Sequence, residues 1–231
     1  MTRHSLILLS YKRADLIEAR INEICDLIPH RDDTEVIVFD NGSDNTVRLV
    51  LADLTLRRHH HTIPIRYHFQ DPNIGFGRAF NAAVKHTEGE IIHLISNDVA
   101  IKGDITYPLE NLGQRVIACH QLIKHDAGWN HFGEAPPIPY PAGYYIAMYR
   151  TLWDELEGFD EQFYPYDCED LDLGMRALQD PTIELVEFPG LPINHTVAGT
   201  IGYSPERFDH TCRMRVLFAK KWGLENRPER P

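Results

Sequence analysis

The sequence predicts an α/β protein whose central sheet is mostly parallel and carries helices on both faces. Within the first hundred of the 231 residues, short apolar runs alternate with longer segments of helical period. The apolar runs are continuous, as expected of strands that are buried on both faces. Strands joined through helices run in the same direction, so this alternation favours a parallel sheet covered on both sides.

The first half of the chain is expected to hold four strands and three helices. The expected strands are 5–10, 35–40, 63–70 and 90–96. The expected helices are 13–28, 46–56 and 73–89. In the first helix the isoleucines recur at helical spacing, which indicates one buried face. Asp44 or Ser43 can cap the second helix, and Gly89 is expected to end the third.

The second half of the chain is less regular. The expected strands are 115–123, 183–188 and a short one that ends at His195. The expected helices are a short one within 150–163 that Gly158 ends, 168–179 and 204–222. Between them, 128–145 is rich in glycine, proline and aromatic residues, which predicts a long ordered loop. The chain shows no internal repeat and no linker, so a single domain over 1–231 is expected.

The composition narrows the class of protein. A net charge of -11 disfavours nonspecific binding to nucleic acid or anionic membranes, because both attract clustered lysine and arginine. No apolar run approaches the ~20 residues of a membrane helix, and the start lacks a small-residue cleavage site, so we expect a cytoplasmic protein. The four cysteines form no CxxC pair, which argues against a zinc or disulfide framework.

Polar segments follow each of the first four strands. They are SYKR (10–13), DNGSDN (40–45), QDPNIGFGR (70–78) and SNDV (96–99). Because ligands bind beyond the carboxyl ends of parallel strands, these segments are expected to gather along one rim. Asp40 and Asp98 could each be an ordinary turn residue, but together on one rim they favour a pocket. Asp40 could bind a base or ribose, and Asp98 suits a hard cation such as Mg²⁺ or Mn²⁺.

Two common nucleotide-binding motifs are not matched. Gly75 and Gly77 open a helix, where backbone can approach a ligand, but GFGRAF lacks the last glycine of a dinucleotide fingerprint. The chain also contains no GKS or GKT phosphate loop. A dinucleotide-dependent dehydrogenase and a P-loop enzyme are therefore both disfavoured.

A cluster of acids and a lone histidine complete the candidate residues. Asp167, Glu169, Asp170 and Asp172 crowd a helix start, where acids can simply oppose the helix dipole. Mutual repulsion can also raise the pKa of one of them and make it a general base near neutral pH, which we favour. His195 alone would be structural more often than functional, but beside a carboxylate metal site it becomes a candidate ligand.

These segments together resemble family-2 glycosyltransferases of the GT-A fold, with a Rossmann-like sheet, and are similar in motif to rhamnosyl- and galactofuranosyl-type enzymes. The resemblance covers about 5–200 and rests on six segments in the family's order. They are LLSYKRAD, VIVFDNGSDN, NIGFGRAFNAA, LISNDVAI, GYYIAMYR with GFDEQFYPYDCEDLDLGMRA, and NHTVAGT. Each segment alone is weak, whereas six in order are specific.

The resemblance implies a nucleotide-sugar donor, expected to be a UDP- or dTDP-sugar, and Mn²⁺ or Mg²⁺. The residues that it places at the donor are Ser10, Tyr11, Arg13, Asp40, Asn41, Gly75, Arg78 and Asn97. SND (96–98) stands where the family has Asp-x-Asp, so Asp98 is the expected metal ligand and Ser96 is a departure. His195 matches a supplementary ligand, and Glu169 with Asp170 matches the acidic pair, Asp170 being the expected base. The resemblance further implies inversion at the anomeric carbon.

The same resemblance divides the chain into a nucleotide-binding half, about 1–100, and an acceptor-binding and catalytic half, about 101–231. Aromatic and histidine side chains near the loop are candidates for an acceptor platform, since sugar faces stack on rings; the alternative is a packed lid. They are Trp129, His131, Tyr144 and Tyr145. The expected acceptor is a glycan, a lipid-linked sugar or a small molecule. A nucleic-acid acceptor is disfavoured by the net charge.

Two other functions remain open from the sequence. A nucleotidyltransferase would need a basic phosphate-binding loop near the N-terminus, where SYKRAD offers one lysine and one arginine. A binding module without catalysis would not need the Glu169–Asp170 pair.

Overall fold

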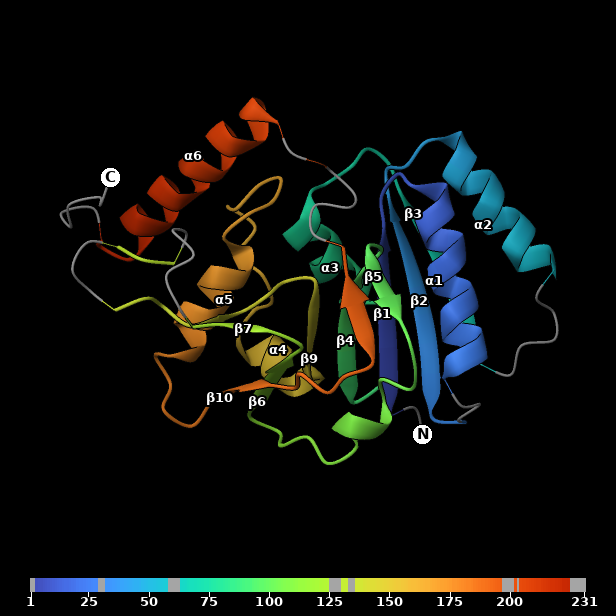
Figure 1. The fold of residues 1–231 in the computed structure, drawn as a ribbon, viewed down its shortest axis with the longest axis horizontal. Coiled ribbons are helices and arrows are strands. Elements are labelled where there is room, and N and C mark those ends of the chain that lie inside the picture. The colour runs from blue at the N-terminus through green and yellow to red at the C-terminus, as the bar shows by residue number, and fades with distance from the viewer. Residues whose placement is uncertain are drawn as a thin grey trace.

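The computed structural model describes residues 3–28, 32–57, 63–124, 130–132, 136–196, 202 and 204–224. A seven-stranded sheet in the order β10-β6-β9-β4-β1-β2-β3 runs through the molecule (Figure 1). Its strands are β1 (His4–Ser10), β2 (Thr34–Asn41), β3 (Ile65–Gln70), β4 (Ile91–Ser96), β6 (Val116–Cys119), β9 (Tyr145–Tyr149) and β10 (Glu184–Glu187). All neighbours are parallel except at β9, which is antiparallel to both β4 and β6. The predicted fold class, a mostly parallel sheet between helices, is confirmed.

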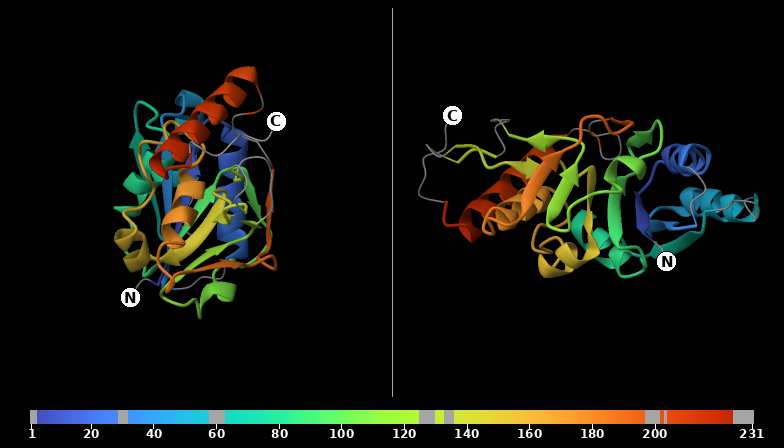
Figure 2. Two further views of the ribbon diagram at one scale, coloured as in Figure 1. Left: turned by 90° about the vertical axis from the view of Figure 1, so that its left-hand side faces the viewer. Right: turned by 90° about the horizontal axis from the view of Figure 1, so that it is seen from below.

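Helices cover both faces of this sheet. They are α1 (Ala14–Leu27), α2 (Asn45–Arg57), α3 (Phe76–Val84), α4 (Arg150–Glu155), α5 (Glu169–Ala177) and α6 (Pro205–Lys221), with a short 3₁₀ helix η1 (Tyr107–Leu109). The helices α1 and α2 lie on one face, and α3, α4 and α5 on the other (Figure 2). Leu6 and Leu8 of β1 pack in the cluster that includes α1 and α2, whereas Ile7 and Leu9 pack in the cluster that includes α3, α4 and α5. Successive strand residues point to opposite faces, which explains why the buried strands are continuously apolar.

Several predicted boundaries differ from the structure. The strand β9 was not predicted, because its sequence follows directly on the glycine- and aromatic-rich segment. The helix α3 starts after Gly75 and ends well before Gly89. Thr87 Oγ1 donates to Val84 O at 2.7 Å, and Glu88 N donates to Glu35 Oε1, which draws the chain out of the helix toward β4. The helix α4, in contrast, is short and ends before Gly158 as expected, and Glu157 and Gly158 have positive φ.

Two small antiparallel pairs flank the main sheet. One joins β5 (Val99–Ile101) to β11 (Ile193–His195), with His195 opposite Val99. The other joins β7 (Leu122–Ile123) to β8 (Tyr140–Pro141), so part of the expected loop is strand. Both pairs lie beside the carboxyl ends of the central strands. They therefore bring residues of the second half of the chain close to these strand ends.

The helix α6 is fastened to α5 by an apolar cluster and a buried carboxylate. Phe218 packs with Phe163 and Leu171 in this cluster. Asp172, which is fully buried, accepts from Lys221 Nζ at 2.6 Å and pairs with Arg176 Nε at 2.8 Å. One member of the acidic cluster therefore holds two helices together. Across the part of the chain that the structure describes, no helix has the length and apolar character needed to traverse a bilayer.

Candidate active site

A cavity of about 640 Å³ lies at the carboxyl ends of the first four strands. Each of the four rim segments contributes to its wall: Tyr11 after β1, Asn41 at the end of β2, Gly75 before α3, and Asn97 after β4. The second half of the chain forms the opposite wall of the cavity and contributes two carboxylates and one imidazole to it. These residues are Glu169, Asp170 and His195. Asp98 also lines this cavity, whereas Asp40, which was expected to share a pocket with it, does not.

Asp98 and His195 form the candidate metal-binding pair. The pairing of β11 with β5 brings His195 Nε2 to 3.7 Å from Asp98 Oδ1, and Thr196 N donates to Asp98 O at 3.1 Å. Burial lowers the pKa of His195, although the Asp98 carboxylate acts in the opposite direction. A neutral imidazole keeps a lone pair for a cation. Within the described residues, no three or more histidine, cysteine or acidic side chains could hold a metal by themselves.

A tyrosine fixes the orientation of the His195 ring. The rings of Tyr144 and His195 are stacked, with centroids 4.0 Å apart and planes 10° apart. The Tyr144 hydroxyl is hydrogen-bonded to His120 Nδ1 at 2.7 Å, which anchors the other end of the tyrosine. The imidazole is therefore held between a fixed aromatic face and the carboxylate of Asp98.

Asp170 has the properties of a general base. It stands in the first turn of α5, where its Oδ2 accepts from Gly143 N at 2.9 Å and its Oδ1 from Leu171 N at 2.8 Å. Burial raises the pKa of Asp170 to about 6, against the effect of these two donors. A carboxylate with a pKa close to neutrality can accept a proton from a hydroxyl group. Glu169 is 5% exposed, and burial together with the Asp170 carboxylate raises its pKa well above the usual range.

The turn before β9 links the two halves of this constellation. Gly143 N holds the Asp170 carboxylate, and the adjacent Tyr144 holds the His195 ring. The Tyr144 carbonyl also accepts from Ser96 N at 3.0 Å, which joins the turn to the SND segment. The distance between the candidate base and the candidate metal ligands is thus set by two consecutive residues.

The expected nucleotide-binding residues of the rim divide into two groups. Tyr11, Asn41, Gly75 and Asn97 line the cavity. Asn41 also braces the loop before α3, because its Nδ2 donates to Gly75 O and its Oδ1 accepts from Ile74 N, each at 3.0 Å. Gly75 has φ of 87°, and a Cβ there would lie 2.7 Å from a backbone oxygen, so only glycine fits this close turn.

Four other expected donor residues do not line the cavity. Ser10 and Asp40 are fully buried behind its wall, where Ser10 Oγ donates to Asp40 Oδ1 at 3.3 Å. Burial raises the pKa of Asp40. Arg13 is exposed and forms a two-pronged pair with its neighbour Asp15. Arg78 donates to Glu161 O at 3.0 Å and lies over the Tyr164 ring, outside the cavity.

The expected acceptor platform is only partly present. Tyr144 lines the cavity, but Tyr145 is fully buried and its hydroxyl is bonded to His93 Nδ1 at 2.9 Å, so its ring offers no face to an acceptor. The two side chains differ because Tyr144 belongs to the turn before β9, whereas Tyr145 is the first residue of that strand. His131 accepts from Arg215 through its carbonyl and does not line the cavity, and Trp129 lies outside the described residues.

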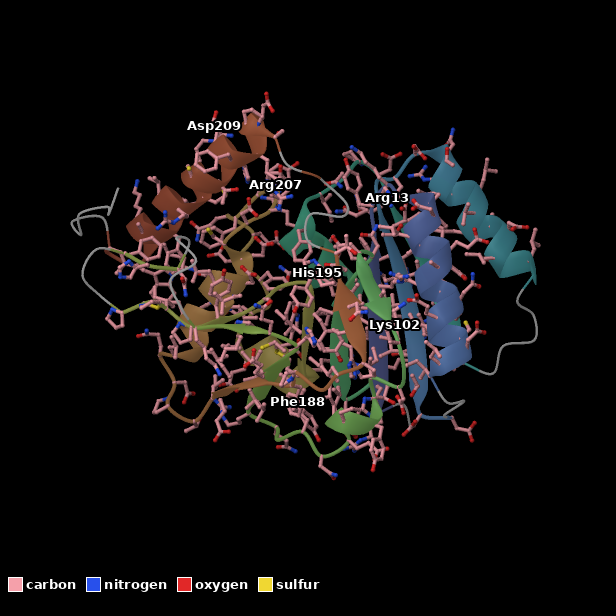
Figure 3. The ribbon with its side chains drawn as sticks, in the orientation of Figure 1. Arg13, Lys102, Phe188, His195, Arg207 and Asp209 are labelled. Carbon is pink, nitrogen blue, oxygen red and sulfur yellow. The ribbon has the colours of Figure 1, made fainter. Side chains whose placement is uncertain are left out.

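Several cavity residues had not been predicted. Tyr140, Tyr164 and Tyr166 add aromatic surface, and Arg207 of α6 is the single lysine or arginine among the described residues that line the cavity. Figure 3 shows Arg207 on the α6 side and Arg13 on the α1 side, with His195 between them. No local pattern distinguishes Arg207 from the other cations of α6, since it reaches the cavity only through the docking of α6 on α5.

The mostly parallel, Rossmann-like sheet has the architecture of the GT-A fold, and Asp98, His195 and Asp170 lie at the cavity beside its carboxyl edge. Residues 5–172, more than half of the chain, match the family described as glycosyl transferase family 2. The chain therefore belongs to this family. No protein with a curated function matches the sequence significantly.

Solved structures share this fold. The mannosyltransferase PcManGT from Pyrobaculum calidifontis, in complex with GDP-Man and Mn²⁺, has a TM-score of 0.67 and is 17% identical; the match covers 96% of this chain and 72% of that one. TarS 1-349 from S. aureus, in complex with UDP, has a TM-score of 0.63 and is 15% identical, covering 94% and 65%. GalNAc-T7 with UDP, GalNAc and Mn²⁺ has a TM-score of 0.69 and is 11% identical, covering 100% and 52%. The chain thus spans about half to three-quarters of these proteins.

Proposed function

We propose that this protein is an inverting, metal-assisted glycosyltransferase that moves a sugar from a nucleotide-sugar donor to an acceptor hydroxyl. The observation that carries the proposal is the meeting of Asp98, His195 and Asp170 around one cavity. Such a transfer needs charge neutralisation on the leaving group and removal of a proton from the acceptor. A pair of cation ligands can supply the first, and a carboxylate of near-neutral pKa the second.

Asp98 and His195 would hold Mn²⁺ or Mg²⁺. Asp98 Oδ1 and His195 Nε2 lie 3.7 Å apart, so the two side chains are close enough to contact one ion. The bound ion would offset the charge that develops on the departing diphosphate. The Mn²⁺ of two structurally similar proteins supports this choice of metal.

The donor is proposed to lie along the strand ends, with its nucleotide near Tyr11, Asn41, Gly75 and Asn97. The similar structures carry GDP-Man or UDP, which supports a nucleotide-sugar donor. A UDP- or dTDP-sugar remains our expectation. Asp40 and Ser10 would act indirectly, by supporting the end of β2 from behind the cavity wall.

Asp170 is proposed to take the proton of the acceptor hydroxyl. As that proton leaves, the acceptor oxygen forms a bond to the anomeric carbon and the bond from this carbon to the diphosphate oxygen breaks. A single displacement of this kind inverts the anomeric configuration and releases a nucleoside diphosphate. With a pKa of about 6, Asp170 is mostly ionised at neutral pH and can accept the proton of the acceptor hydroxyl. Glu169, whose burial favours the neutral form, would limit the negative charge beside the base.

We further propose that 1–231 act as one unit, with about 1–100 binding the donor and about 101–231 supplying base and acceptor contacts. The proposed acceptor is a glycan, a lipid-linked sugar or a small molecule. The seven-stranded sheet supports the single unit, because the strands β10, β6 and β9 of the second half continue the sheet of the first half through the pairing of β9 with β4.

The proposal is tested with Asp170→Asn and a surface control, Asp180→Asn. Thermal shifts are measured with UDP, dTDP and GDP, with and without Mn²⁺, and sugar release is measured from the corresponding nucleotide sugars. We expect a Mn²⁺-dependent shift by one diphosphate in all three proteins. Turnover should fall by about 10²- to 10⁴-fold in Asp170→Asn and remain in Asp180→Asn.

Other outcomes identify the rival functions. Binding without turnover in the wild type would indicate a binding module. Release of pyrophosphate from a nucleoside triphosphate and a sugar phosphate would indicate a nucleotidyltransferase. Absence of any shift with every nucleotide would exclude the proposed donor class.

A further inference from the structure

A second cavity of about 410 Å³ adjoins the first. The two cavities share Tyr140, Asp167, Glu169, Asp170 and Arg207 in their walls. Asp98 and His195 line only the first cavity. The candidate base therefore stands at the junction, with the candidate metal ligands on one side and the second cavity on the other.

This arrangement assigns a direction to the proposed reaction. In a single displacement the attacking oxygen approaches the anomeric carbon from the side opposite the leaving group. The leaving diphosphate would be held by Asp98 and His195, so the acceptor hydroxyl must reach Asp170 from the side away from them. The second cavity is the space on that side.

One face of α6 forms a wall of the second cavity. The lining residues recur at spacings of three or four, as neighbours on one helix face do. They are Ser204, Arg207, Phe208, Thr211 and Arg215. The two arginines are eight residues apart, which is about 12 Å along a helix. Backbone carbonyls anchor both, since Arg207 donates to Gly202 O at 2.8 Å and Arg215 to His131 O at 2.9 Å.

The side chains of this wall suit a particular class of ligand. Guanidinium groups match the geometry of carboxylates and phosphates. Phe208 is 59% exposed beside them and offers an apolar surface to a sugar face. On the opposite wall Asp167 accepts from Thr211 Oγ1 at 2.6 Å, and Asp170 accepts from two backbone amides. These acids are thus engaged by donors of the protein.

We propose that the second cavity is the acceptor subsite, and that it takes a saccharide carrying a carboxylate or phosphate near the attacked hydroxyl. The inference rests on the proposed transferase function and specifies its acceptor class. The helix α6 lies beyond the residues that match the family, so the family match assigns no role to this wall. Arg207 and Arg215 would bind the negative groups, and Phe208 would contact the sugar ring.

The test compares Arg207→Gln and Arg215→Gln with Arg213→Gln, an exposed residue of α6 that lines neither cavity. The probes are a uronic-acid disaccharide, a phosphorylated disaccharide and a neutral disaccharide, titrated calorimetrically in the presence of UDP and Mn²⁺. We expect the wild type and Arg213→Gln to bind one anionic probe at least about tenfold more tightly than the neutral probe. Each cavity variant should lose most of that preference, and added salt should weaken it.

The outcomes separate this inference from the transferase proposal. A preference for the uronic acid or for the phosphate identifies the anionic group. Equal binding of neutral and anionic probes, absence of binding by either anionic probe, or an unchanged preference in both cavity variants overturns the inference. Binding of UDP with Mn²⁺ reports separately on the donor site and on folding of the variants. Absence of binding of UDP, dTDP and GDP alike by the wild type would instead overturn the proposed function.

Discussion

Replacing Gly143 with alanine is expected to raise the pKa of Asp170 and so move the acid limb of the transfer rate to higher pH. Gly143 N donates to Asp170 Oδ2 at 2.9 Å. A Cβ at position 143 would lie 3.1 Å from this oxygen and 3.3 Å from Asp170 Cβ, so the carboxylate must move away from the amide. Gly143 lies outside the left-handed backbone region, so alanine adds no backbone strain.

The size of the effect follows from the hydrogen bond. A bond to a charged group contributes about 1.5–3 kcal/mol, and weakening it by half costs about 1 kcal/mol. Because about 1.4 kcal/mol corresponds to one pKa unit, the shift is a little under one unit. The donor stabilises the ionised form, so its loss raises the pKa of Asp170 from about 6 toward 7. The rate should fall about threefold at pH 6 and remain nearly unchanged at pH 8.

The assay is the pH dependence of turnover between pH 5 and 9, with an NMR titration of the Asp170 carboxyl as a readout that needs no acceptor. Gly190→Ala is the matched control, because no atom lies within 4 Å of a Cβ at that position. An acid limb that stays in place in Gly143→Ala would refute the reasoning. A loss of rate that is equal at every pH would also do so, because it would indicate displacement of the base without a change in its pKa.

Further predictions concern the metal ligands, the core and the pH dependence of stability. Tyr144→Leu removes the ring stacked on His195 and should raise the Mn²⁺ concentration for half-maximal activity by about tenfold, whereas Tyr144→Phe should change it less. Asp172→Asn should lower the free energy of unfolding in urea by about 3 kcal/mol, because it removes the buried carboxylate that Arg176, Lys221 and Trp222 share. Asp180→Asn weakens a more exposed ion pair with Arg115 and should lower it by less than about 1 kcal/mol. Burial lowers the pKa of His93 well below 6.5, so the unfolded chain binds a proton there that the folded chain does not. Unfolding free energies should therefore fall as pH drops below about 6.5, and this dependence should weaken in His93→Gln.

The parts of the site that follow from topology could be predicted from the sequence. Continuous apolar runs separated by helices indicated parallel strands, and parallel strands place their carboxyl ends together. This reasoning brought the four rim segments to one cavity. The family resemblance assigned roles to Asp170 and His195, which were already candidates. Both residues lie on elements whose position the local pattern does not determine.

The direction of individual side chains was not predictable in the same way. Asp40 and Asn41 are consecutive, yet the first is buried behind the wall and the second lines the cavity. Tyr144 and Tyr145 also divide, although Tyr144 belongs to the turn before β9 and only Tyr145 to the strand. No residue type distinguishes the members of either pair. Which of two neighbours faces the ligand depends on the register of the strand and the path of the adjoining turn, and both are set by contacts with distant strands.

By itself, the sequence determined the fold class, the succession of the first four strands along the chain and the polar segments at their ends. These features follow from hydrophobic period and turn chemistry, which are local properties of the chain. The tertiary structure alone decided that Gly143 and Tyr144 hold the base and the imidazole, and that Arg207 replaces Arg78 as the cavity arginine. These contacts join segments that are far apart in the chain. They depend on how β9 enters the sheet and how α6 docks on α5, which is decided by packing rather than by local sequence.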